Sequence, residues 1–335
     1  MTATVPFASE EGHVLPGLVD IQVNGAYGHD FTNDPSSIWE VARLLPRHGV
    51  AAFLPTVISS PVEVATEAMS IVAAGPPPGF VGARPLGVHV EGPVISPRKR
   101  GTHPLEALQE PTIEWAERLI EAGPPTMVTI APELAGAEPV VRRLAAAGVV
   151  VSIGHSDASA DEAAMSIGWG VSHATHLFNA MSGLHHRHPG VAAAVLAHHR
   201  ITCGLIADGV HVANTMLRLA WRTLGPERIA LVTDAMAAAG LADGEYTIGP
   251  VEVTVADGAV RNQDGALAGS AATLDRVAAV MQRVTGCSLD DLAAMASSTP
   301  ARIVGYRRHP GDAVLLDDEL QVVATAIAGE IVWES

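Results

Sequence analysis

Five side chains that can bind a metal or move a proton each follow a short β-branched run of the sequence. They are Glu91, His155, His176, His211 and Asp234. A set of one carboxylate and two imidazoles suits Zn²⁺ or a similar divalent ion and leaves a coordination position for water. Any one of these residues alone is better explained as a hydrogen-bonded group in a loop. Five of them in equivalent positions predict a metal site.

The β-branched runs that precede these residues are eight in number. They are His13–Asn24, Val50–Thr56, Leu86–Glu91, Met127–Ala131, Val149–Ile153, Val171–Thr175, Ile201–Ala207 and Ile229–Thr233. Between them lie segments with helical periodicity, which include Ile38–Arg47, Pro61–Ala73, Thr112–Ala122, Ala137–Ala146, Ala160–Ile167 and Thr215–Leu224. Ser159 is a plausible N-cap, and Gly123, Gly148 and Gly225 end helical segments. This alternation predicts a (β/α)8 TIM barrel, with a doubly wound open sheet as the structural rival.

In a barrel of this kind the carboxyl ends of the strands meet at one rim, where the loops build the active site. The five candidate residues all fall at or just beyond such ends. The barrel is therefore the element that must bring them together.

The sequence pattern divides the chain into a barrel and a smaller unit. The catalytic barrel is expected over residues 15–305, with a hairpin insertion near 245–262 formed by Tyr246–Val255 and Gly258–Val260 around an Asp257-Gly258 turn. Helices are expected at Ala271–Val284 and Leu289–Ser297. The strand-like tail Asp312–Trp333 places residues 306–335, together with residues 1–14, in a reduced β-sandwich-like domain.

Composition limits the classes of partner. Of 335 residues, 48% are hydrophobic but only 4% aromatic, which favours an aliphatic core inside a parallel sheet. The net charge of −16 and the absence of basic clusters argue against nucleic acid and anionic membranes. No apolar run approaches the roughly 20 residues of a membrane span, and no signal peptide is visible. With only Cys203 and Cys287, a disulfide framework is excluded and a cytoplasmic location is expected.

Eight short segments resemble one family. In chain order they are PGLVDIQVNG, HVEGP, KRGTH, GHSDA, ATHLFNAM, IADGVHV, LVTDAM and LAGSAATL. Between Leu15 and Arg302 the chain resembles the N-acetylglucosamine-6-phosphate deacetylases of the amidohydrolase superfamily. The motifs ATHLFNAM and KRGTH are specific to that family, whereas GHS and TDA indicate only the superfamily. The resemblance implies hydrolysis of the acetamide of N-acetyl-D-glucosamine 6-phosphate in amino-sugar catabolism and cell-wall sugar recycling.

The resemblance also implies a role for each matching residue. Glu91, His155 and His176 match metal ligands, Asp234 the catalytic aspartate, and His211 the histidine beside the substrate carbonyl. The matched substrate contacts are Thr102, His103, Asn179, Ala180, Arg187, His211, Ala268, Gly269 and Ser270. Arg187 matches an arginine that reaches the substrate phosphate of the neighbouring subunit, which implies a homodimer. For Thr102, His103 and the Ala268 loop, ordinary turn chemistry is an equal alternative.

The number of metal ions follows from two missing features. Many superfamily members hold a second metal with a His-x-His pair after the first strand, where this chain has Gln22 and Asn24. Binuclear relatives also use a carboxylated lysine, but the only lysine, Lys99, lies in the PRKRG loop. We therefore expect one divalent ion per chain, most plausibly Zn²⁺, with Fe, Co, Mn or Cd as alternatives. Gln22 and Asn24 are expected to be supporting or structural hydrogen-bonding residues.

Other conspicuous residues are expected to have modest roles. The cluster His185, His186 and His188 is expected to add positive potential or to be solvated, and His89 and His173 to lie inside the barrel. Cys203 is expected to be a core thiol.

Two rival functions remain open. The first is a deacylase for another N-acetyl amino-sugar phosphate or for an N-acyl amino acid. The second is a catalytically inactive structural barrel.

Overall fold

The computed structural model describes residue 7 and residues 12–248, 251–256, 259–262 and 267–335. Its centre is a parallel sheet of eight main strands. They are β2 (Leu18–Val23), β5 (Val50–Ile58), β7 (His89–Glu91), β8 (Met127–Ile130), β9 (Val150–Ile153), β10 (Val171–Ala174), β11 (Thr202–Leu205) and β12 (Ile229–Leu231). Each strand pairs with its neighbour in chain order, and the two-residue β6 (Arg84–Pro85) pairs with β5.

This strand order confirms the predicted barrel. A doubly wound sheet has a point at which the strand order reverses, whereas here the order runs without reversal from β2 to β12. The two end strands approach each other through an isolated parallel bridge between Val23 and Ala235, which nearly closes the barrel.

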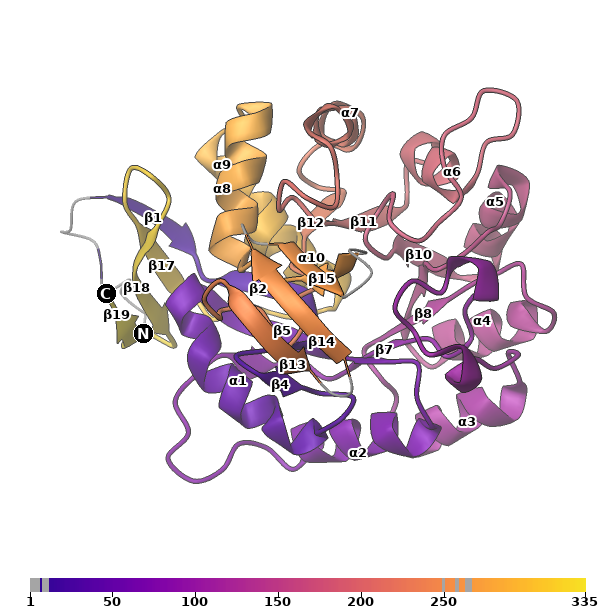
Figure 1. Cartoon of the computed structure of the whole chain (residues 1–335), viewed down its shortest axis with the longest axis horizontal. Coiled ribbons are helices and arrows are strands. Elements are labelled where there is room, and N and C mark those ends of the chain that lie inside the picture. Colours follow the sequence, from indigo (N-terminus) through magenta and orange to yellow (C-terminus); the bar gives the residue numbers. More distant parts are fainter. Residues whose placement is uncertain (1–6, 8–11, 249–250, 257–258, 263–266) are drawn as a thin grey trace.

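Helices cover the outside of the barrel (Figure 1). They are α1 (Ile38–Leu44), α2 (Val62–Ala73), α3 (Ile113–Glu121), α4 (Ala137–Ala146), α5 (Ala160–Trp169), α6 (Val191–Ala197), α7 (Asn214–Leu224) and α8 (Leu274–Thr285). Ser159 caps α5 as predicted: its hydroxyl accepts from the Glu162 amide, and Glu162 accepts in return from the Ser159 amide. After α8, the helix expected at Leu289–Ser297 is α9 (Leu289–Ala293) followed by a π-helical turn (Ala294–Ser298) and α10 (Thr299–Ile303).

The first predicted strand is corrected by the structure. The run His13–Asn24 is two strands: β1 (His13–Pro16) belongs to a separate sheet, and only β2 belongs to the barrel. Gly17 separates them where the chain passes close to Ala51. A Cβ on Gly17 would lie 2.7 Å from the Cβ of Ala51, so the crossing needs glycine.

The separate sheet has the order β1-β17-β18-β19, with β17 (Ala313–Leu316), β18 (Val322–Ile327) and β19 (Glu330–Glu334) running antiparallel as expected for the tail. Phe7 is buried against its apolar face, beside Ala313, Leu315 and Ala324. The assignment of this unit as a domain of its own stays a prediction.

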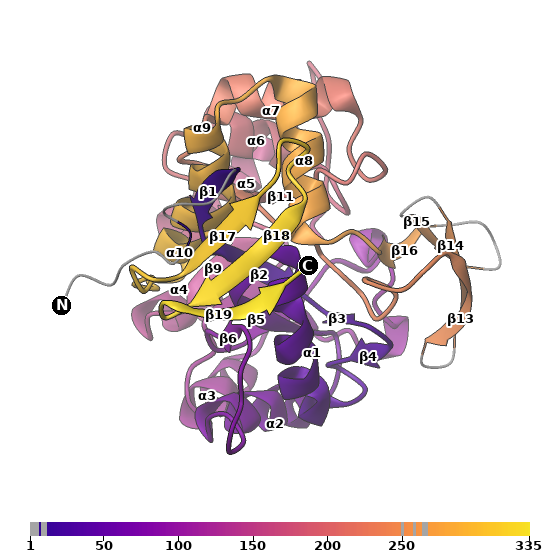
Figure 2. The ribbon, with the colours of Figure 1, turned by 90° about the vertical axis from the view of Figure 1, so that its left-hand side faces the viewer.

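The insertion after the eighth barrel strand is a four-stranded antiparallel sheet of β13 (Gly244–Ile248), β14 (Val251–Ala256), β15 (Ala259–Asn262) and β16 (Leu267–Ser270). It lies on a different side of the barrel from the β1–β19 sheet (Figure 2). The single strand expected at Tyr246–Val255 is wrong, because this segment contains parts of two strands, β13 and β14, which pair antiparallel. The expected Asp257-Gly258 turn lies outside the described residues.

Polar side chains form a layer inside the barrel beneath the rim. His89 Nε2 lies 2.7 Å from the Thr129 hydroxyl, which lies 2.7 Å from that of Thr175. Burial lowers the pKa of His89 to about 4, so its ring is neutral. His173 is buried against the Thr202 hydroxyl, and burial raises the pKa of Cys203 to about 12. His89, His173 and Cys203 therefore have the internal positions that the sequence predicts.

None of the helices in the described segments combines sufficient length with sufficient apolarity to cross a membrane.

Candidate active site

Three residues at the rim converge on one point. Glu91 is the last residue of β7, and His155 and His176 lie two residues beyond β9 and β10. His155 Nε2 and His176 Nε2 lie 3.2 and 3.0 Å from Glu91 Oε1, and 3.0 Å from each other. All three side chains are buried.

These distances fit a divalent metal ion. Ligand atoms about 2.0–2.1 Å from a tetrahedral Zn²⁺ lie about 3.3 Å apart, close to the spacing of the three atoms here. His155 Nδ1 lies 2.8 Å from the carbonyl oxygen of Lys99, which can only accept, so His155 keeps its proton there and turns the Nε2 lone pair inward. Lys99 itself forms an ion pair with Asp157 at 3.6 Å and lies off the strand ends, as the sequence indicates.

The electrostatics of the cluster match this chemistry. Burial opposes ionisation of Glu91, yet the adjacent imidazoles of His155 and His176 hold the pKa of Glu91 well below its ordinary value. Burial also opposes the charge on His176, but the bond to Glu91 raises the pKa of His176 to about 9. An anionic carboxylate and two imidazoles in a dry pocket form a site for a cation.

The backbone is unusual at the same places. His155, His176 and Asp234 have φ values of 46°, 27° and 49°, in the left-handed region that residues other than glycine seldom adopt. Such strain concentrates at functional sites, where surrounding structure maintains it. The turns after three strands are thus bent so that these side chains point toward one centre.

Asp234 is held by two amide donors from β2 and its extension. Gln22 Nε2 and Asn24 Nδ2 donate to Asp234 Oδ1 at 3.0 and 2.7 Å, and Gln22 Nε2 also lies 3.1 Å from Glu91 Oε1. Both amides bind Oδ1, so Oδ2 is the oxygen oriented for another proton. Burial, followed by the charge of Glu91, raises the pKa of Asp234 to about 6, in the range of a general base.

His211 is oriented by a carboxylate that sequence reasoning missed. Asp208 Oδ2 lies 2.6 Å from His211 Nδ1, while Asp208 Oδ1 accepts from the amides of Val210 and His211. Burial opposes the charge of Asp208, but the hydrogen bond from His211 lowers its pKa. The Asp-x-x-His spacing within IADGVH could have indicated that Asp208 contacts His211.

His103 lies in the same cluster as Glu91 and His155. Its Nδ1 accepts from the Ser59 amide at 3.2 Å, and burial lowers the pKa of His103 to about 3. The neutral ring therefore carries its proton on Nε2. In this tautomer His103 is a hydrogen-bond donor at the site and not a fourth metal ligand.

The other predicted substrate contacts occupy three loops around this centre. Asn179 bonds to the His176 carbonyl, and the Ala180 carbonyl accepts from the Ser156 amide. Ser270 bridges to Ala235, next to Asp234, so the strand with Ala268 and Gly269 ends beside the base. Thr102 is exposed.

Arg187 does not join the cluster within its own chain. It is exposed on the loop before α6, where it lines a surface groove with Asp157, Ser159 and Glu162. The flanking His185, His186 and His188 are exposed too, with ring centroids 4.6 and 5.2 Å apart for the pairs with His185.

The sequence of residues 13–312 matches the family model described as Amidohydrolase family. The chain is a member of the amidohydrolase family. A mouse N-acetylglucosamine-6-phosphate deacetylase is 39% identical to this amidohydrolase over 351 residues, covering 97% of this chain and 84% of its own. An Escherichia coli N-acetylgalactosamine-6-phosphate deacetylase is 36% identical, covering 95% and 87%. The structure of the Mycobacterium smegmatis N-acetyl-D-glucosamine-6-phosphate deacetylase in complex with N-acetyl-D-glucosamine-6-phosphate is similar with a TM-score of 0.86 at 34% identity, covering 96% and 87%.

Proposed function

We propose that this amidohydrolase hydrolyses N-acetyl-D-glucosamine 6-phosphate to D-glucosamine 6-phosphate and acetate, in amino-sugar catabolism. The observation that carries the proposal is the triangle of Glu91, His155 and His176 donor atoms beside the Asp234 carboxylate. Relatives of that activity match nearly the whole chain and support the choice of substrate. Because a phosphorylated sugar does not cross membranes unaided, we place the reaction in the cytoplasm.

Glu91, His155 and His176 would hold one divalent ion, Zn²⁺ being the best match to two imidazoles and a carboxylate. When bound, the ion supplies Lewis acidity that makes water nucleophilic near neutral pH and polarises the acetyl carbonyl.

Asp234 moves the proton in this mechanism. Its Oδ2 takes a proton from the attacking water, while Gln22 and Asn24 hold the carboxylate through Oδ1. The same oxygen then donates that proton to the nitrogen as the C–N bond breaks. Acetic acid and the amine result, and transfer of the acid proton gives acetate and the protonated amine, so one water is consumed for each amide bond.

His211 stabilises the charge that develops on the acetyl oxygen. Because Nδ1 donates to Asp208, a proton on Nε2 makes the ring cationic, and the Asp208 carboxylate balances that charge. Nε2–H then donates to the carbonyl oxygen as it becomes an oxyanion.

The phosphate is bound away from the bond that breaks. We assign it to Arg187 from the neighbouring subunit of a homodimer, together with Asn179 and Ala180, whereas the Thr102–His103 loop is assigned to another part of the substrate. The exposure of Arg187 outside its own chain's cluster supports this arrangement. Such remote binding orients the acetamide.

The galacto epimer is the second candidate, since a deacetylase for N-acetylgalactosamine 6-phosphate is 36% identical. Acetate release should be measured on both epimeric phosphates, on free N-acetylglucosamine and on an N-acetyl amino acid. We expect the largest kcat/KM for the gluco phosphate. A larger value for another substrate would replace the proposed function, and no turnover on any would favour an inactive barrel.

One tightly held divalent ion per chain is the expected metal content. Glu91, His155 and His176 would supply the protein ligands of one ion, and Gln22 and Asn24 bind Asp234 where binuclear relatives bind a second metal. Elemental analysis of the purified protein should give one equivalent, and Glu91→Gln should reduce it strongly. Asp318→Asn, on the exposed turn before β18, is the control. Two tightly held equivalents would contradict the assignment.

A further inference from the structure

The barrel has one seam without a strand ladder. Among the described residues, β2 pairs with β5 and β12 pairs with β11, but no ladder joins β2 to β12. Residues on both sides of this seam meet in the active site: Gln22 and Asn24 on one side contact Asp234 on the other. Whatever fixes the two sides relative to each other therefore fixes the proposed base.

A buried carboxylate spans the seam directly below these residues. Asp20 on β2 is 1% exposed, and its Oδ2 accepts from the Thr233 hydroxyl at 2.6 Å. Its Oδ1 accepts from the amides of Gln22 at 3.2 Å and Thr233 at 3.4 Å. Thr233 also receives the Ala235 amide at 3.1 Å.

The main-chain bonds above this link continue the connection. The Asp234 amide donates to the Gln22 carbonyl at 3.0 Å, and the Asn24 amide donates to the Ala235 carbonyl at 2.7 Å. Asp20 thus begins a short series of cross-seam bonds that ends at Asn24 and Asp234.

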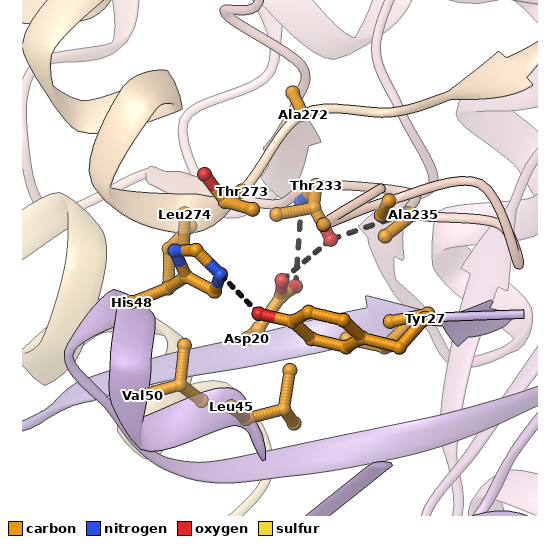
Figure 3. A pocket seen from close by; sticks show the side chains of 14 residues that line it. Asp20, Tyr27, Leu45, His48, Val50, Thr233, Ala235, Ala272, Thr273 and Leu274 are labelled. Carbon is orange, nitrogen blue, oxygen red and sulfur yellow. Dashed lines mark hydrogen bonds between the residues drawn. The ribbon is translucent and has the colours of Figure 1, made fainter. Parts of the chain in front are cut away.

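Among the residues drawn in Figure 3, Asp20 forms hydrogen bonds only to Thr233. Figure 3 shows its carboxylate turned toward Thr233, beside a cavity of about 20 Å³, which is room for about one water. Across that cavity the Tyr27 hydroxyl is bonded to His48 at 2.6 Å, and His48 faces Asp275 at 3.3 Å. Burial raises the pKa of Asp20 to about 7, and the hydrogen bonds from Thr233 and the Gln22 amide partly offset the cost of burying this carboxyl without a cationic contact.

We propose that Asp20 is a positioning residue. Through its hydrogen bond to Thr233 it fixes the relative position of the two sides of the seam, so that the side-chain amides of Gln22 and Asn24 can donate hydrogen bonds to Asp234 Oδ1. This inference rests on the proposed function for its kinetic consequence. Its structural consequence is independent of that function.

The main variant is Thr233→Val, which keeps the shape of the side chain and removes the donor to Asp20. Because a displacement of about 1 Å can cost about 10²-fold in rate, we expect kcat for N-acetylglucosamine 6-phosphate to fall about 10–100-fold. KM and metal content should stay within about threefold of wild type, since ligands and phosphate contacts are untouched. Thr233→Ser restores the hydroxyl and should restore kcat.

The matched control is Thr325→Val. Thr325 is a buried threonine whose hydroxyl donates to the Pro46 carbonyl at 2.6 Å, in the separate sheet. It should lower stability without lowering kcat per metal-loaded chain. An equal loss of kcat in Thr325→Val would assign the effect to stability alone and overturn the proposal.

A double-mutant cycle tests the route. If Asp20 acts through Thr233, Asp20→Asn lowers kcat in the wild-type background but changes it little in the Thr233→Val background. If Asp20→Asn instead lowers kcat by the same factor in both backgrounds, Asp20 does not act through Thr233.

Hydrogen–deuterium exchange gives a readout that needs no turnover. Peptides covering residues 20–25 and 231–236 should exchange faster in Thr233→Val and Asp20→Asn than in wild type or Thr325→Val. Unchanged exchange would overturn the proposal even if another substrate proves correct. Absence of wild-type turnover on the phosphorylated sugar, in contrast, would count against the proposed function alone.

Discussion

Asp234→Asn should abolish most turnover while leaving the metal content near one equivalent per chain. The asparagine oxygen can still accept from Gln22 and Asn24, as Asp234 Oδ1 does. Its amide nitrogen replaces Oδ2, however, and has no basic lone pair with which to take a proton from water. General acid–base catalysis contributes about 10²–10⁴-fold, so we expect kcat/KM to fall by at least that factor.

The matched control for this change is Asp312→Asn. Asp312 is also buried, and it accepts from the amide of Ala328 in the C-terminal sheet, outside the rim. This variant should keep its turnover per folded, metal-loaded chain. Activity of Asp234→Asn within a few-fold of wild type, at full metal content, would show that another group moves the proton.

The positions of the rim residues were predictable from the sequence because their signal is local. A β-branched run predicts a buried parallel strand, and in a closed barrel every strand delivers its carboxyl end to one rim. Glu91, His155, His176 and Asp234 could therefore be grouped without knowing any contact between them. In the structure, Glu91 Oε1, His155 Nε2 and His176 Nε2 lie within 3.2 Å of one another.

The supporting contacts were not predictable, for physical reasons that differ from case to case. The acceptor for His155 is the main-chain carbonyl of Lys99, and a carbonyl has no signature in the sequence. The tautomer of His103 depends on the Ser59 amide, 44 residues away along the chain. Among the helices, α6 has the sequence VAAAVLA, which lacks the polar face that periodicity detects.

Division of the first strand was only partly predictable. Pro16-Gly17 interrupts the run His13–Asn24 and favours a turn, whereas the change of sheet at that point depends on the approach of Ala51 to Gly17. Sequence identifies residues that favour a strand, whereas sheet membership is decided by packing between distant segments.

Arg187→Ala should reduce kcat/KM on N-acetylglucosamine 6-phosphate far more than any activity on the free sugar. A guanidinium binds two phosphate oxygens through parallel charge-assisted hydrogen bonds, each worth about 1.5–3 kcal/mol, so a loss of about 10²-fold or more is expected. Because the protein carries a net charge of −16, few other groups can replace this local cation. The loss should lie largely in KM, since the contact is remote from the amide.

Arg142→Ala is the control for this variant. It removes the same charge from an exposed position on α4, where Arg142 pairs with Glu138, and both substrates should be unaffected. Equal losses on phosphorylated and free sugar in Arg187→Ala would remove Arg187 from phosphate recognition.

Subunit mixing decides which chain supplies Arg187. In a dimer of one Arg187→Ala chain and one Asp234→Asn chain, one site combines an intact Asp234 with the partner's intact arginine. After verified exchange of equal amounts, half of the dimers are mixed and each has one complete site, so activity should recover to about a quarter of wild type. If Arg187 serves its own chain, every site lacks either the arginine or the base, and mixing restores nothing. The expected recovery follows from the exposure of Arg187 on the loop before α6, outside the cluster that Asp234 shares with Glu91 in the same chain.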